Sequence, residues 1–200
     1  MISSLTVPFI IDRFRKKTKK EEIEKGINIE LKEIKNRLIN NSFQIYSKYG
    51  QLDRGLINWL IVNYKSVDSV DNDIKIINKL EQLNELDDQE LQQSQIYKAI
   101  IQENRNTTLG FKKFSLPFLD IHLNNLSLFD SIFQQKILYI RDRINLINGE
   151  IDLVLFFLKK SFDDVSIENS ELLKTNSVNS EKNLADWSRQ LVDKINALYL

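Results

Sequence analysis

The sequence predicts an all-α protein: an elongated antiparallel helical bundle with two long helices, several shorter ones and a tethered C-terminal helix. Long stretches place apolar residues three or four positions apart, which lines one face of a helix. The 200 residues include only five glycines and two prolines, so few positions force a helix to stop. With 42% hydrophobic residues, the chain can bury a core, which excludes a fully disordered chain.

Residues 1–20 combine a short apolar run with a basic run. Six bases stand against one acid, Asp12, so this segment carries a net charge of +5 and the remainder −5. A secretory signal peptide has the opposite order of charge and apolar residues. The apolar run is also too short to span a bilayer. We therefore expect a separate N-terminal segment on an intracellular protein.

The first long helix is expected from about Lys19 to Tyr49, at the start of a bundle that covers residues 21–162. Its apolar positions follow the helical period, and Gly50 is a suitable stop. The apolar residues of this face are Ile23, Ile27, Leu31, Ile34 and Leu38.

Shorter helices are expected between the two long ones. Their predicted starts are residues that cap or open a helix well. These starts are Asp53, the end of a loop over Ser66–Asp73, Asp87 with Glu90 three positions later, and Pro117 after a loop over 105–116.

The second long helix is expected from about Asp130 to Ser161. Its apolar residues alternate steps of four and three, the pattern of a coiled-coil seam. Two long helices of matched length favour antiparallel packing, and the seam suits either this bundle or a second copy of the chain. The seam consists of Phe133, Ile137, Ile140, Ile144, Ile147, Ile151, Val154 and Leu158.

The C-terminal region divides into two parts. Residues 163–180 are rich in Asp, Ser and Asn, and so few apolar residues predict a polar tether. Residues 181–200 form an amphipathic helix capped by Ser180. This helix docks either on its own bundle, which we favour, or in a partner's groove, where Trp187 and Leu191 are the candidate contacts.

The chain has few residues suited to catalysis or metal binding. It contains no cysteine and one histidine, His122, which we interpret as a packed or surface residue. The acidic residues Asp68, Asp71 and Asp73 lack the spacing of a calcium loop and suit helix capping instead. We predict no cofactor, no metal site and no catalytic residue. The remaining enzyme alternative is a site built from carboxylates alone.

The basic run has three interpretations. It is the solvated start of a helix, a membrane anchor that combines apolar residues with bases, or a contact for a nucleic-acid backbone. The last is disfavoured because Phe14 is the one aromatic residue within the run. The candidate membrane- or polyanion-binding residues are Phe9, Ile10, Ile11, Arg13, Arg15, Lys16, Lys17, Lys19 and Lys20.

These observations favour a non-catalytic interaction or scaffold subunit with a protein partner. We expect residues 1–20 to hold it at the cytoplasmic face of an anionic membrane. The alternative is a soluble helical protein whose basic N-terminus binds nucleic acid or an acidic protein. A homo-oligomer through the Phe133–Leu158 seam is also compatible with the sequence.

Overall fold

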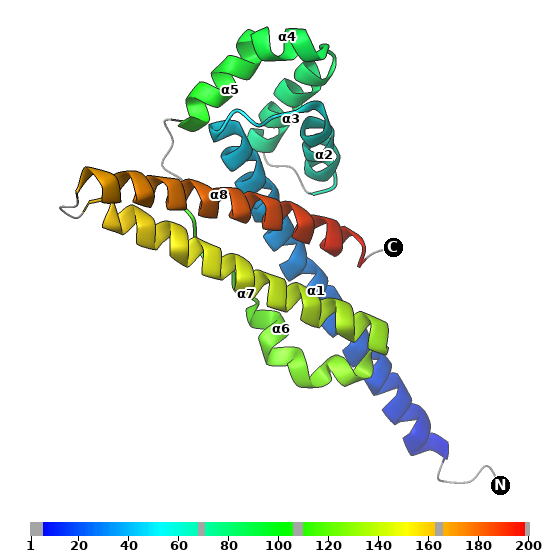
Figure 1. The fold of residues 1–200 in the computed structure, drawn as a ribbon. Helices are drawn as coiled ribbons and strands as arrows, with labels where there is room; N and C mark the ends of the chain where they lie inside the picture. The colour runs from blue at the N-terminus through cyan, green and yellow to red at the C-terminus, as the bar shows by residue number, and fades with distance from the viewer. Residues whose placement is uncertain (1–5, 68–70, 106–109, 163–165, 199–200) are drawn as a thin grey trace.

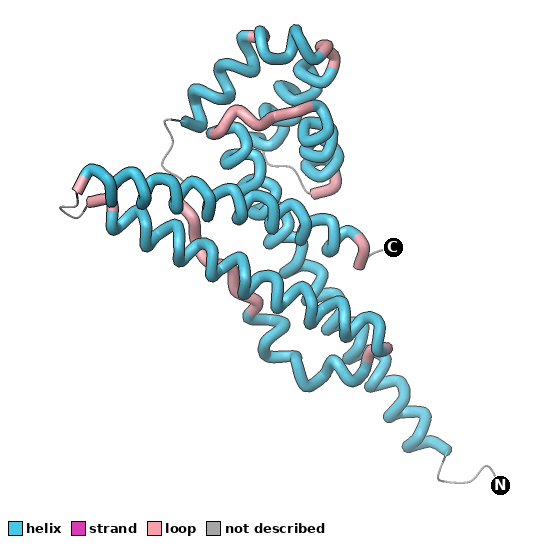
Figure 2. The backbone as a smooth tube through the Cα atoms, in the orientation of Figure 1, coloured by secondary structure: helices cyan, strands magenta, loops and turns pink. Residues whose placement is uncertain are grey.

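The all-α prediction is confirmed. A computed structural model describes the backbone of residues 6–67, 71–105, 110–162 and 166–198, and the side chains of these ranges except 6–10, 71 and 72. All regular structure within them is helical (Figure 2). Three helices are long: α1 (Thr6–Lys48), α7 (Ser131–Lys160) and α8 (Ile167–Asn196).

The three long helices form an elongated molecule (Figure 1). Helices α7 and α8 lie side by side in antiparallel directions, and α1 crosses behind them. The closest packing joins α8 to both α7 and α1. The C-terminal helix is therefore the central element of the bundle.

Helix α1 is longer than predicted at its N-terminus. It begins at Thr6 rather than near Lys19. Pro8 is compatible with this start because the first turn of a helix needs no backbone N–H at that position. The predicted stop is confirmed: Gly50 adopts a φ of +65°, and its N–H donates to the carbonyl of Ser47 at 3.0 Å.

Four short helices pack around the C-terminal end of α1. They are α2 (Arg54–Lys65), α3 (Asp71–Asn84), α4 (Asp88–Gln93) and α5 (Gln95–Arg105). The predicted caps are confirmed: Asp53 accepts the N–H of Leu56 at 2.7 Å, and Asp87 and Glu90 form a complete capping box. The helix expected after Asp87 is interrupted at Ser94. The loop expected over Ser66–Asp73 is too long at its end, because α3 already begins at Asp71, and residues 68–70 lie outside the described part.

A short helical segment also packs against α1. It consists of α6 (Pro117–His122) and the 3-10 helix η1 (Leu123–Leu128), and Pro117 opens it as predicted. Glu30 of α1 caps α6, because its carboxylate accepts the N–H groups of Phe118 at 2.8 Å and Leu119 at 3.0 Å.

Helix α7 matches its predicted bounds. Asp130 caps it by accepting the N–H of Phe133 at 2.9 Å, and Ser161 follows its last residue. The six central residues of the predicted seam are each at most 4% exposed, because this face packs within the chain. The seam is therefore not open to a second copy. These six residues are Ile137, Ile140, Ile144, Ile147, Ile151 and Val154.

The polar tether predicted over residues 163–180 is wrong for residues 166–180, and residues 163–165 lie outside the described part. Ser166, not Ser180, caps α8. Ser180 lies inside the helix and is 6% exposed. Residues 167–179 continue a helix whose other half is packed, and there small side chains let α8 approach its neighbours closely: the Ser42 hydroxyl of α1 donates to the carbonyl of Ala185 at 3.3 Å.

Candidate functional site

The N-terminal part of α1 extends beyond the rest of the molecule (Figure 1). From residue 11 onward, the first buried side chain of the helix is Ile23, and residues 11–19 are all exposed. At 1.5 Å per residue, the exposed residues 11–19 correspond to about 13 Å of helix. Ion pairs one turn apart brace it: Lys16 with Asp12 at 2.8 Å and Lys17 with Glu21 at 3.9 Å.

Five of the six predicted bases lie on this projecting part. Lys20, the sixth, is half-buried where the segment meets the bundle, and its ammonium lies 5.2 Å from the ring centre of Phe129. Lys20 thus joins the projection to the bundle, and the other bases face solvent. These five are Arg13, Arg15, Lys16, Lys17 and Lys19.

Two large apolar side chains are exposed among these bases. Ile11 is 46% exposed and Phe14 is 66% exposed. Because they are three residues apart, they share a face of α1. Arg15 and Lys19 line the same open face. The structure thus brings the predicted apolar and basic residues together on one helix. The backbone of Phe9 and Ile10 belongs to α1, but their side chains lie outside the described residues.

The two residues predicted for a partner's groove are packed within the chain. Leu191 is 1% exposed, and Trp187 is half-buried against the core. Helix α8 uses Leu191 to dock on its own bundle, and Trp187 packs against the same core while part of its surface lines a narrow hollow beside Tyr139 and Lys194.

A broad open hollow of about 990 Å³ lies between the end of α1, the start of α2, α4 and α8. The charged groups that line it already have structural partners. Arg54 pairs with Asp88 at 3.3 Å, Asp53 caps α2, and Asp186 accepts the hydroxyl of Tyr46. These groups stabilise the helix junction, and none is placed as a nucleophile beside a base.

Tyr46, which lines this hollow, keeps its phenol protonated. Burial raises the pKa of Tyr46 above its ordinary value, and the hydrogen bond to Asp186 raises the pKa further. The hydroxyl therefore serves as a donor that joins α1 to α8, and its ionised form is not available as a base.

His122 is packed rather than poised for chemistry. Its ring lies 4.5 Å from that of Phe118, and its Nδ1 is 3.2 Å from the side-chain nitrogen of Asn125. Among the described residues, no three His, Asp or Glu side chains are grouped so that they could hold a metal ion.

Comparison with known proteins adds no relative: no family model, curated protein or solved structure matches the chain. Within the described part, no helix has the length and apolar character needed to cross a bilayer. The fold and its exposed surfaces are therefore the basis for a functional proposal.

Proposed function

We propose that this chain is a helical interaction subunit that attaches peripherally to anionic membranes through the N-terminal part of α1. The observation that carries this proposal is the exposure of Phe14 and Ile11 beside Arg15 and Lys19, on a part of α1 that no other described element covers. Stable attachment to a membrane surface needs two signals, and this segment has an apolar and a basic one.

The charge of the segment suits a lipid surface with acidic headgroups. Each base near such a surface contributes about 1 kcal/mol, and these contributions fall off within a Debye length. Exposed apolar side chains add affinity only where they enter an apolar phase, which a nucleic acid backbone does not offer. The combination therefore favours a membrane over a polynucleotide.

The test is co-sedimentation of the full chain with anionic and neutral vesicles. We expect binding to phosphatidylserine-containing vesicles and little binding to phosphatidylcholine alone. The variant Ile11→Ser with Phe14→Ser should lose most of this binding because it keeps the charge but removes the apolar contact. The variant Arg15→Gln with Lys19→Gln should lose about 2 kcal/mol of affinity, roughly a 30-fold reduction.

A matched control is available in α2. Val62 is 66% exposed, the same fraction as Phe14, and its helix α2 lies far from the projecting segment (Figure 1). The variant Val62→Ser should bind vesicles like the unmodified chain. If the Ile11 and Phe14 variant also binds undiminished, the apolar contact is unnecessary and the membrane proposal fails. Equal binding of that variant to DNA, with loss only in the charge variant, would instead support a polyanion-binding segment.

A further inference from the structure

Helix α7 carries a second apolar stripe beside its buried seam. Its first four members follow an exact seven-residue repeat, and the fifth lies three residues, or most of a turn, after the fourth. Its members are 39% to 66% exposed. Tyr139, the least exposed, borders α8 across a narrow hollow that it lines with Trp187 and Lys194. The stripe consists of Ile132, Tyr139, Leu146, Leu153 and Phe156.

The spacing of the stripe is that of a helix-to-helix contact. A seven-residue repeat keeps apolar side chains facing one partner helix, and the repeat from Ile132 to Leu153 extends over about 33 Å. Gly149 lies in the same stripe, and the space around it is open, with no atom within 4 Å of where a Cβ would lie. A bare glycine at this position lets a facing helix approach closely.

We propose that this stripe pairs with the same stripe of a second copy, forming an antiparallel two-fold dimer. The five side chains expose on the order of 500 Å² in total. This is close to the lower limit of specific interfaces, about 600 Å² on each partner. The dimer is therefore expected to be reversible.

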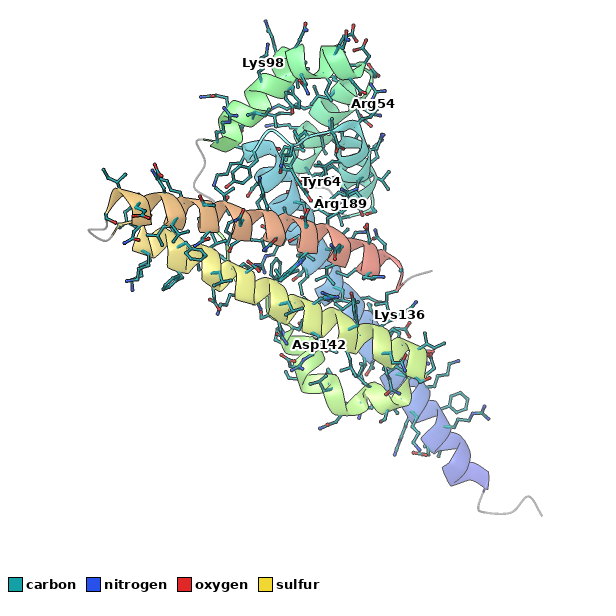
Figure 3. All side chains as sticks on the ribbon, viewed as in Figure 1. Arg54, Tyr64, Lys98, Lys136, Asp142 and Arg189 are labelled. Atoms are coloured by element: carbon teal, nitrogen blue, oxygen red, sulfur yellow. The ribbon has the colours of Figure 1, made fainter. Side chains whose placement is uncertain are left out.

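The charges at the middle of the stripe select the antiparallel orientation. Asp142, labelled in Figure 3, is exposed beside Arg143, whose guanidinium stays over the ring of Tyr139 at 5.0 Å and donates to its hydroxyl at 2.9 Å. A parallel pair in register would place Asp142 against Asp142. With the two-fold axis between positions 142 and 143, each carboxylate instead meets the guanidinium of the other copy.

The same axis also pairs the apolar residues well. It places Ile132 opposite Leu153 and Tyr139 opposite Leu146, so each side chain of the repeat meets another apolar side chain. The two charges of opposite sign make a second copy a better partner for this face than an anionic lipid surface. The proposal is independent of the membrane function of α1.

The first test is the mass of the protein in solution as a function of concentration, measured by sedimentation equilibrium. The mass should rise from 23.5 kDa toward twice that value. The variant Leu146→Glu should weaken the dimer by at least 30-fold, because it places a charge in the apolar stripe. Ile121→Glu is the matched control, since Ile121 is 76% exposed on α6 and outside the stripe.

Orientation is tested by cross-linking, which is straightforward because the chain has no cysteine. A mixture of the Ile132→Cys and Leu153→Cys variants should be joined by a short thiol-reactive linker, whereas each variant alone should not. Cross-linking of Ile132→Cys with itself would overturn the antiparallel arrangement. The dimer proposal is overturned if the unmodified chain stays at the monomer mass at high micromolar concentration, or if folded Leu146→Glu dimerises as well as the control.

Discussion

Two glycines show how the same residue serves different purposes in two long helices. Gly26 lies where α1 meets α6, and an added Cβ would be only 2.1 Å from Cζ of Phe118. Gly149 lies on the open face of α7, where an added Cβ would meet nothing. Glycine in a helix interior costs about 1 kcal/mol relative to alanine, and of these two only Gly26 has a packing reason within the single chain to tolerate this cost.

Gly26→Ala is therefore expected to destabilise the protein although it improves helix propensity. The ring of Phe118 has to move, and its contacts with His122 and α1 are disturbed. Gly149→Ala, the control, should stabilise the protein by about 0.5 to 1 kcal/mol. Chemical denaturation of both variants gives the two free energies of unfolding.

A double variant tests the cause. When Phe118 is replaced by Ala, the further change Gly26→Ala should become stabilising because the ring is absent. If Gly26→Ala has the same effect in both backgrounds, the contact with Phe118 is not what requires glycine.

At the residue scale, the sequence predicts those contacts that a side chain makes with residues close to it in the chain. The caps Asp53, Asp87 and Asp130 are confirmed because each acts on an amide two or three positions away. Glu30 caps α6 across 88 positions of the chain, and no local pattern marks it. Arg37 is similar, since its guanidinium lies 4.2 Å from the ring centre of Phe114, far along the chain.

At the element scale, α8 shows what apolar patterning does not capture. The composition of residues 166–179 correctly indicates little burial, since each of these side chains is exposed or half-buried. Low burial does not prevent a helix that continues from a packed half. In that half, buried Ser180, Ala185 and Ser188 are small rather than strongly apolar, and close approach of α8 depends on their size.

Hydrogen exchange of the backbone amides should distinguish the weakly packed first half of α8 from its buried second half. Amides of residues 167–177 are expected to exchange through local opening of the helix, because few buried contacts hold them. Amides of residues 184–195 should exchange far more slowly, through global unfolding, since Leu184, Val192 and Ile195 are each fully buried. Equal protection along α8 would show that the first half is stabilised by contacts other than core burial.

The sequence predicted the basic and apolar residues of the candidate site, but not that they lie on a projecting helix. The bases and apolar residues of the first twenty positions are visible in the sequence. Their placement on a projecting helix depends on where the bundle ends along α1, at Lys20 and Ile23. That boundary is set by the docking of η1, which the local pattern of α1 does not contain. In α7, likewise, the sequence shows both apolar stripes, but only the structure shows which of them is buried and which is exposed.

At the scale of the whole molecule, tyrosine hydroxyls join the other elements to the C-terminal half of α1 and the turn that follows it. Four tyrosines donate across element boundaries in this region. Each donation needs the protonated phenol. The pairs are Tyr46 with Asp186, Tyr49 with Glu181 at 2.8 Å, Tyr64 with Asn40 at 2.7 Å, and Tyr97 with the carbonyl of Gly50 at 3.0 Å.

Stability should therefore decline in alkaline solution. Burial raises the pKa of all four phenols above the ordinary value of about 10. Above about pH 10 the unfolded chain loses these protons while the folded chain retains them, so the folded state binds more protons and the free energy of unfolding falls as the pH rises. The stabilisation is fully present below pH 10 and is lost as the pH approaches the raised values.

Denaturation midpoints from about pH 8 to pH 11 measure this effect, and Tyr49→Phe separates it from the titration of surface lysines. The variant lacks the hydrogen bond to Glu181, so it should lose about 1 kcal/mol at pH 8. Because it also lacks one phenol that the fold keeps protonated, its stability should decline less steeply above pH 10 than that of the unmodified chain. A parallel decline in the two proteins would mean that Tyr49 does not resist ionisation in the fold, and unchanged stability at pH 8 would mean that its hydroxyl does not hold α8 in place.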